Sequence, residues 1–107
     1  MGERGIRSRV IKALRQGKVQ HEAIDGGVNE DDLLQSGQVS AEEVIDFLKL
    51  TRGMEHEEMI HPKMPHVRMN IFRSNIEAGG LNFDWYVKCY CLSEIVKEVW
   101  FVSVHSI

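Results

Sequence analysis

Two stretches in the last quarter of the chain carry side chains that could do chemistry. Residues 84–91 read DWYVKCYC and residues 99–105 read VWFVSVH, and both are rich in the aromatic and β-branched residues typical of strands. Successive side chains of a strand point to opposite faces. If Trp100, Val102 and Val104 cover a core together with Trp85 and Val87, the outer face carries five polar or aromatic side chains: Tyr86, Lys88, Tyr90, Ser103 and His105.

These residue types suit cleavage of RNA without a metal. A base must remove the proton of a 2′-hydroxyl, an acid must protonate the leaving 5′-oxygen, and cations must stabilise the charged phosphorane. Histidine titrates in the range needed for either proton transfer, and tyrosine can stack an unpaired base. A loop before the strands offers Arg52, His61 and Lys63 to the same face. The pattern therefore predicts a catalytic face, and a solvated sheet face is the alternative.

Metal binding and nucleophilic catalysis fit the sequence less well. Possible metal ligands occur at six positions, but their spacings match none of the paired zinc patterns: His56, His61, His66, Cys89, Cys91 and His105. The two cysteines share the apolar face of their strand, where a free thiol acts as a small hydrophobic group. The chain also has no phosphate-binding glycine loop and no GxSxG motif. We expect no metal and no cofactor, and a small domain stabilised by a structural metal is the alternative.

The first half of the chain is predicted to be helical. Residues 6–16 place apolar side chains on one stripe, and Gly17 follows where a left-handed cap would lie. A basic rim surrounds that stripe and is usually a solvated face, although it could contact phosphates. A short helix is expected through Leu33–Leu34 after a cap at Asn29. A third helix starts at the capping box of Ser40 and Glu43 and runs to about residue 52.

The second half is predicted to form a sheet. Residues 53–65 hold two prolines and lack apolar periodicity, so they are expected to form a loop, with a strand near 56–61 as an alternative. Strands are expected over 66–73 and over the two stretches described first, with a hairpin connection over 75–82. The sequence thus predicts one α+β domain over 1–107, with helices over about 6–52 packed on one face of a three- to four-stranded antiparallel sheet over about 66–105.

Composition and charge limit the function classes. The chain has 107 residues and a net charge of −3. Residues 1–62 hold 8 Lys and Arg against 12 Asp and Glu, and residues 63–107 hold 5 against 4. An overall basic footprint typical of nucleic-acid binders is therefore missing, and an RNA site must be local. No apolar run has the length of a membrane span and the N-terminus does not read as a signal peptide, so we expect no membrane association and a cytoplasmic protein.

The order of several motifs resembles the MqsR-like toxins of type II toxin–antitoxin pairs, which are related in fold to RelE-type mRNA interferases. The resemblance covers about residues 40–107 and rests on the helix EVIDFLKLTRG, the strand WYVKCY and the closing strand WFVSVH. It implies a RelE-like fold and a metal-free endoribonuclease that is selective for sequence, acts on single-stranded RNA and is neutralised by an antitoxin protein. It also implies a catalytic role for Lys88, with Tyr86 or Tyr90 beside it.

Two functional hypotheses follow. In the first, the chain is an RNA-cleaving toxin with Lys88, His105 and His61 as catalytic residues. Substrate would then be bound by side chains of the outer face and the loop: Arg52, Tyr86, Tyr90, Ser103 and Lys63. In the second, the chain is a non-enzymatic binding module, such as an immunity protein, an antitoxin-like partner or a phage-encoded inhibitor. The acidic first half would then dock on a basic partner.

Overall fold

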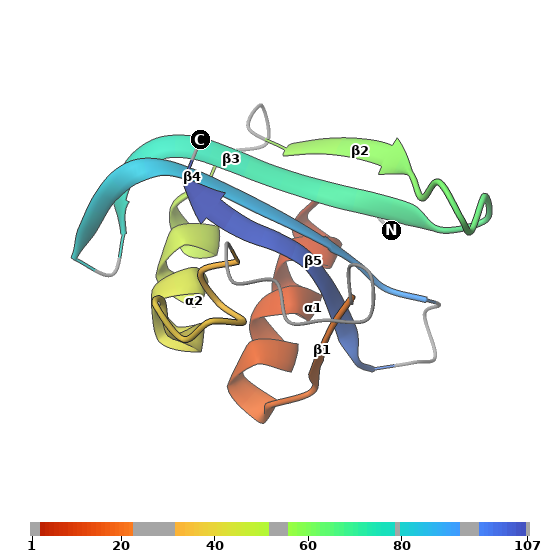
Figure 1. The fold of residues 1–107 in the computed structure, drawn as a ribbon, viewed down its shortest axis with the longest axis horizontal. Coiled ribbons are helices and arrows are strands. Elements are labelled where there is room, and N and C mark those ends of the chain that lie inside the picture. Colours follow the sequence, from red (N-terminus) through yellow and green to blue (C-terminus); the bar gives the residue numbers. More distant parts are fainter. Residues whose placement is uncertain (1–2, 23–31, 52–55, 79, 93–96, 107) are drawn as a thin grey trace.

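The computed structural model describes residues 3–22, 32–51, 56–78, 80–92 and 97–106. Two helices cover one face of a sheet of five strands (Figure 1). The expected α+β class, with helices on one face, is confirmed. The elements in chain order are α1 (Glu3–Gln16), β1 (Val19–His21), α2 (Ala41–Leu50), β2 (His56–Ile60), β3 (Arg68–Ala78), β4 (Leu81–Tyr90) and β5 (Val99–Ser106).

The strands lie in the order β1-β5-β4-β3-β2. Three of the four pairings are antiparallel, and β1 pairs in parallel with β5. The predicted strands do pair antiparallel, but the prediction of three or four strands was wrong in number, because it missed β1 and its parallel pairing with β5. β2 confirms the alternative of a strand near 56–61, whereas β1 has only three residues, too few for an alternating pattern to be read.

Local sequence signals define the helix ends. The Ser40 hydroxyl accepts a hydrogen bond from the Glu43 N–H, and the Glu43 carboxylate accepts one from the Ser40 N–H, which is the expected capping box. α2 ends at Leu50, with Thr51 as its C-cap, slightly earlier than predicted. Gly17 follows α1 with a φ of 70°, a conformation that favours glycine.

Residues 32–38 form turns in place of the short helix expected through Leu33–Leu34. The buried carboxylate of Asp32 holds this segment in place. Its Oδ1 accepts hydrogen bonds from the N–H groups of Leu34 (3.0 Å) and Gln35 (2.9 Å), while its Oδ2 accepts one from Val104 N–H (3.1 Å). Asp32 thus ties this segment to β5, and the cap proposed at Asn29 lies outside the described residues.

The hairpin between β3 and β4 is tighter than predicted. Ala78 pairs with Leu81, so the strands continue to within two residues of each other and the connection expected over 75–82 was too long. Gly80 has a φ of 79°, and a positive φ of this kind is what a two-residue hairpin turn requires. The long strands carry the outer-face residues on one continuous surface.

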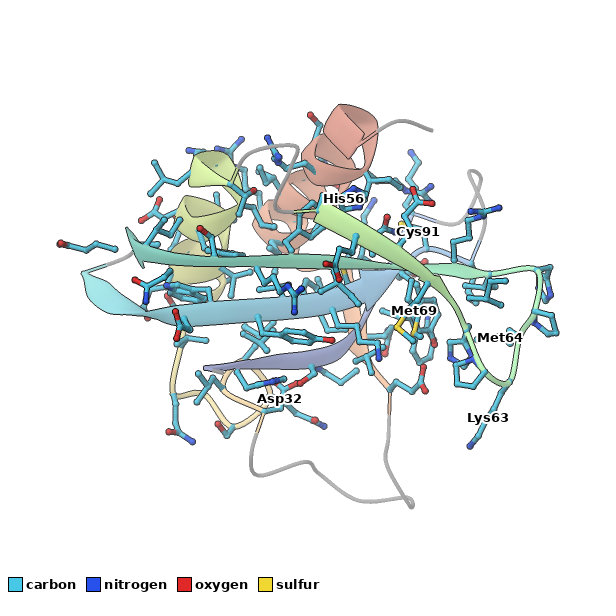
Figure 2. The ribbon with its side chains drawn as sticks, turned by 90° about the horizontal axis from the view of Figure 1, so that it is seen from above. Asp32, His56, Lys63, Met64, Met69 and Cys91 are labelled. Atoms are coloured by element: carbon cyan, nitrogen blue, oxygen red, sulfur yellow. The ribbon has the colours of Figure 1, made fainter. Side chains whose placement is uncertain are left out.

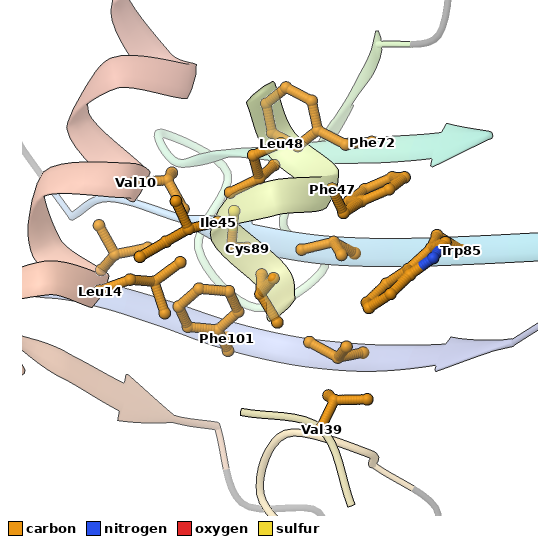
Figure 3. Close-up of a cluster of buried hydrophobic side chains, with 14 of the residues drawn as sticks. Val10, Leu14, Val39, Ile45, Phe47, Leu48, Phe72, Trp85, Cys89 and Phe101 are labelled. Carbon is orange, nitrogen blue, oxygen red and sulfur yellow. The ribbon is translucent and has the colours of Figure 1, made fainter. Parts of the chain in front are cut away.

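The main hydrophobic core lies between the helices and the sheet. It contains Val10 and Leu14 of α1, Ile45 and Leu48 of α2, and residues of three strands, of which Phe72, Trp85, Cys89 and Phe101 are labelled in Figure 3. Phe47 stacks on Trp85 with ring centroids 5.1 Å apart. The apolar stripe predicted for the first helix thus faces the core, and α2 buries Val44, Ile45, Phe47 and Leu48 in the same way.

A β-bulge changes the faces of β5. Lys88 pairs with Ser103, but the next residue of β4, Cys89, pairs with Phe101, so Val102 is the extra residue. Beyond the bulge Phe101 and Val99 point into the main core. Trp100 and Val102 instead pack in a second cluster with Val67, Met69 and Tyr90. The predicted apolar set of Trp100, Val102 and Val104 was thus wrong for two of its three members.

Candidate active site

The outer face, defined as the sheet face opposite the helices, carries the candidate site. Tyr86 pairs with His105, and Lys88 pairs with Ser103, so adjacent strands bring these four side chains together. Residues directly opposite each other have Cβ atoms about 5 Å apart, and diagonal neighbours such as Lys88 and His105 lie about 7–8 Å apart. The bulge comes after Lys88, so it leaves this part of the predicted face intact.

His105 is held from two sides. Its Nδ1 lies 2.6 Å from the Ser103 hydroxyl oxygen, within hydrogen-bond distance. Its ring stacks on that of Tyr86 with centroids 4.5 Å apart and planes inclined by 28°. When Nδ1–H donates to Ser103, the lone pair of Nε2 is left to accept a proton. The cluster therefore fixes the ring and orients one nitrogen for proton transfer.

Cations flank the cluster on both sides. Lys88 is half-buried and, within the described part of the chain, makes no ion pair. Arg73 pairs in register with Tyr86 from β3, and its guanidinium lies 2.8 Å from the Glu57 carboxylate of β2. The sequence reasoning missed Arg73 and Glu57, because only the register of β2, β3 and β4 brings them beside Tyr86.

The Tyr86 phenol keeps its proton. Burial raises the pKa of this group above its ordinary value, the positive charge of Arg73 opposes that rise, and Glu57 adds to it. Tyr86 can therefore donate a hydrogen bond to an anionic substrate at neutral pH, in addition to holding the His105 ring.

Tyr90 and His61 belong to a different cluster at the other end of β4. The Tyr90 hydroxyl donates to the Glu22 carboxylate, and Tyr90 is buried, so its ring is not available to stack a base. His61 is 2% exposed and meets Tyr90 edge-on at 5.1 Å. Its Nε2–H donates to Glu22 at 2.9 Å. Sequence reasoning missed Glu22 because it lies 39 residues before His61.

Both ring nitrogens of His61 are occupied. Nδ1 accepts hydrogen bonds from the N–H groups of Lys63 (3.0 Å) and Met64 (3.2 Å), so the proton is on Nε2. Tyr90 is four residues from Tyr86 along β4, a separation of about 13 Å along a strand. The structure therefore does not bring His61 to His105, and His61 is placed as a structural residue of its loop.

Glu22 titrates as part of this cluster. Partial burial alone would raise the pKa of its carboxyl, but the hydrogen bonds from His61 and Tyr90, with the charge of Lys63, hold the pKa below its ordinary value. The carboxylate is thus the acceptor at the centre of the cluster. We call Glu22, His61 and Tyr90 the Glu22 cluster below.

The two remaining predicted substrate residues lie apart from His105 or outside the described chain. The side chain of Lys63 projects from the loop between β2 and β3 into solvent, beside the Glu22 cluster (Figure 2). Arg52 lies outside the described residues. Of the eight predicted site residues, the structure brings Tyr86, Lys88, Ser103 and His105 into one group.

The candidate metal ligands are dispersed. Among the described residues, no group of three or more His, Cys, Asp or Glu side chains could hold a metal ion. His56 Nε2 lies 3.0 Å from the Asn70 side-chain oxygen, and burial raises the pKa of both Cys89 and Cys91, keeping them as thiols. These residues have local partners or environments that do not require a metal.

No family model matches the chain, and the searches found neither a related curated protein nor a similar solved structure. Neither described helix has the length and apolar character needed to cross a membrane.

Proposed function

We propose that the chain is the toxin of a bacterial toxin–antitoxin pair and cleaves single-stranded RNA on its outer face without a metal. The observation that carries this proposal is the group of His105, Ser103 and Tyr86 beside Lys88. It combines an oriented imidazole, a phenol that keeps its proton and an ammonium group on an uncovered surface. Cleavage of mRNA would take place in the cytoplasm.

In the proposed mechanism His105 is the base. Its Nε2 takes the proton of a 2′-hydroxyl, the 2′-oxygen attacks the neighbouring phosphorus, and the 5′-oxygen leaves, giving a 2′,3′-cyclic phosphate. The hydrogen bond of Nδ1 to Ser103 and the stack on Tyr86 support this role because they hold the ring in one orientation. Ser103 is a positioning residue in this reaction, whereas Tyr86 both holds the His105 ring and binds substrate, because its phenol donates to a phosphate oxygen.

Lys88 supplies the positive charge. A diagonal separation of about 7–8 Å between Lys88 and His105 is wide enough for a phosphodiester to lie between them. The ammonium neutralises the phosphorane and gives a proton to the leaving 5′-oxygen. Arg73 contacts a neighbouring phosphate on the other side of Tyr86, although its ion pair with Glu57 must open to do so.

The test is cleavage of a long single-stranded RNA by purified protein in the presence of EDTA, together with growth after induced expression. Lys88→Ala and His105→Ala should each lower the cleavage rate about 100-fold or more, the usual contribution of a proton-transfer group, and should restore growth. Lys18→Ala is the matched control, because it removes the positive charge of an exposed side chain that is far in the sequence from Lys88 and His105.

A second measurement separates charge from acid catalysis at Lys88. Lys88→Arg keeps the positive charge but cannot give up a proton. It should be slow on normal RNA and recover on RNA whose 5′-bridging oxygen is replaced by sulfur, because that leaving group needs no proton. Full toxicity of the Lys88→Ala, His105→Ala double variant, or loss of wild-type cleavage in EDTA, would contradict the proposal.

A non-enzymatic binding module is the second candidate, and the edge strand β2 favours it. Met59 is 41% exposed and Ile60 is 60% exposed on this strand, whose far edge pairs with no other described strand. An immunity protein or inhibitor could use such an edge to bind a partner, and so could a toxin bound by its antitoxin. Intact RNA after induction of the wild-type protein would favour the binding module.

A further inference from the structure

The Ser103 hydroxyl and the His105 imidazole are placed as a nucleophile and a base. They are two residues apart on β5, and the Ser103 oxygen lies 2.6 Å from His105 Nδ1. A nucleophile within hydrogen-bond distance of a base that a third group orients is typical of enzymes that form covalent intermediates. The third group here is Tyr86, whose ring stacks on the imidazole with centroids 4.5 Å apart. The chain has no GxSxG motif, so only the structure reveals this pair.

The hydrogen bond between the two side chains can run in either direction. A neutral imidazole carries its proton on one nitrogen, and the other nitrogen then accepts a hydrogen bond. With the proton on Nε2, His105 Nδ1 accepts the hydrogen bond of the Ser103 hydroxyl. The proposed RNA cleavage uses the opposite tautomer, in which Nε2 is the free base. Because the two neutral forms exchange protons with water, the same ring can act as a base on either side.

Other histidines and serines of the structure have different partners. The rings of His56 and His61 bond to an amide oxygen and to a carboxylate. The Ser36 hydroxyl donates to a backbone carbonyl oxygen and accepts from a glutamine side chain. Ser103 differs from these residues because its hydroxyl has a base beside it.

Lys88 and Tyr86 place a positive charge and a proton donor next to Ser103. Lys88 pairs with Ser103 across the two strands, so their Cβ atoms are about 5 Å apart. Tyr86 pairs with His105, and burial raises the pKa of its phenol, which therefore keeps its proton. An ammonium and a phenol can both stabilise the negative charge that develops on a carbonyl oxygen under attack. Lys88, Ser103 and His105 are each partly exposed, so a small molecule can reach the hydroxyl.

We propose that Ser103 is a nucleophile, activated by His105, for acyl transfer from small activated esters or thioesters. Nδ1 takes the hydroxyl proton while the Ser103 oxygen bonds to the carbonyl carbon. The bond from that carbon to the leaving oxygen or sulfur then breaks, and the leaving group takes the proton from Nδ1. Water, deprotonated by the same nitrogen, attacks the acyl-serine and releases a carboxylic acid and the free hydroxyl. The surface is open and contributes little binding energy, which favours a substrate with a good leaving group over an amide.

The first test is labelling of the full chain by a fluorophosphonate probe, with the modified residue mapped by mass spectrometry. In this reaction the Ser103 oxygen bonds to phosphorus, fluoride leaves and Nδ1 takes the proton. The probe should label Ser103 about 100-fold faster than the exposed Ser36 in the same sample, since a positioned base typically contributes that much. His105→Phe keeps an aromatic ring to stack on Tyr86 but has no nitrogen, and it should slow the labelling of Ser103 by the same factor. Ser103→Ala should remove the label from this position.

Hydrolysis of p-nitrophenyl acetate is the second test. The wild type should be acetylated at Ser103 and should release p-nitrophenol at a rate that falls about 100-fold in His105→Phe. Three results would each overturn the proposal: labelling of Ser103 less than about 10-fold faster than that of Ser36, labelling that His105→Phe leaves unchanged, or acetylation of Lys88 without Ser103. Both reactions are run without RNA, so a failure of acyl transfer and a failure of RNA cleavage are measured separately.

Discussion

Replacing His61 by alanine should destabilise the protein strongly without acting on the proposed chemistry. The ring is buried and both of its nitrogens are hydrogen-bonded: Nε2 to Glu22, and Nδ1 to the N–H groups of Lys63 and Met64. Alanine removes all three bonds and leaves the Lys63 N–H without its acceptor, whereas the Met64 N–H keeps its bond to the His61 backbone oxygen (3.3 Å). It also removes the packing of the ring against Tyr90.

The contacts set the size of this effect. The unsatisfied Lys63 N–H costs about 1 kcal/mol, and the bond to the Glu22 carboxylate contributes about 1 kcal/mol, since the Glu22 side chain is still 30% exposed. With the lost ring packing, His61→Ala should lower the free energy of unfolding by about 3–5 kcal/mol. A domain of this size is typically stable by about 5–15 kcal/mol. The expected fall in Tm is about 12–20 °C.

A second substitution at His61 distinguishes the hydrogen bonds of Nδ1 from that of Nε2. The Asn Oδ1 and the His Nδ1 are both two bonds from Cβ, so His61→Asn keeps an acceptor for Lys63 and Met64 while losing Glu22. It should cost about 2 kcal/mol, measured by urea unfolding alongside His61→Ala. Equal costs for the two variants, or a cost below about 1 kcal/mol for alanine, would refute the view that the backbone hydrogen bonds hold this loop.

Acid should weaken the same cluster. The pKa of Glu22 in the folded protein lies below its ordinary value of 4.5 because His61 and Tyr90 donate to the ionised form, although burial opposes this. The unfolded chain therefore binds the proton first as the pH falls, and the stability due to Glu22 is present above pH 4.5 and lost below it. The difference in the free energy of unfolding between the wild type and Glu22→Gln should therefore shrink as the pH falls below 4.5. A difference that stays constant would contradict this account.

Two further substitutions probe the elements that hold the sheet. Asp32→Ala removes the acceptor of three backbone N–H groups, including that of buried Val104, and should lower the free energy of unfolding by about 3–5 kcal/mol in urea. Asp32→Asn keeps Oδ1 as an acceptor and should lower it by less. Trp85→Ala removes a fully buried ring stacked on Phe47 and should lower the free energy of unfolding by about 3–5 kcal/mol. Trp85→Phe keeps an aromatic ring and should retain more than half of the stability that the alanine variant loses, in the same assay. A cost within 0.5 kcal/mol of zero for either alanine variant, as at an ordinary surface position, would show that the packing described for it is not formed.

The two helices and the four residues of the candidate site were predictable because their signals are local. A capping box, an apolar stripe and a glycine after the last turn fix the two helices within a few residues. Alternation alone placed Tyr86 and Lys88 on the face opposite Trp85 and Val87, and the pairing of β4 with β5 places Ser103 and His105 beside them. Period-two alternation requires no knowledge of distant residues.

The remaining features depend on contacts between distant residues. The bulge opposite Cys89 reverses which side chains of β5 point into the core. One extra residue in a strand produces no recognisable pattern in the local sequence. β1 is a strand because it pairs with the edge of β5, and the bond from Val104 N–H to Asp32, 72 residues earlier, has no local signal in the sequence. The partner of His61 lies 39 residues away, so a histidine in a polar loop was read as a catalytic group.

The Glu22 cluster also determines how large the candidate site can be. His61 anchors the loop between β2 and β3, and Met64 of that loop packs with Met69 and Tyr90 in the second hydrophobic cluster (Figure 2). The loop therefore covers that cluster and does not extend over the candidate site. The end of the outer face at Tyr86 and His105 has no such cover among the described residues. Under the proposed function, RNA would bind at this end of the outer face, and sequence selectivity would come from the few side chains around Lys88 or from a partner that completes the surface.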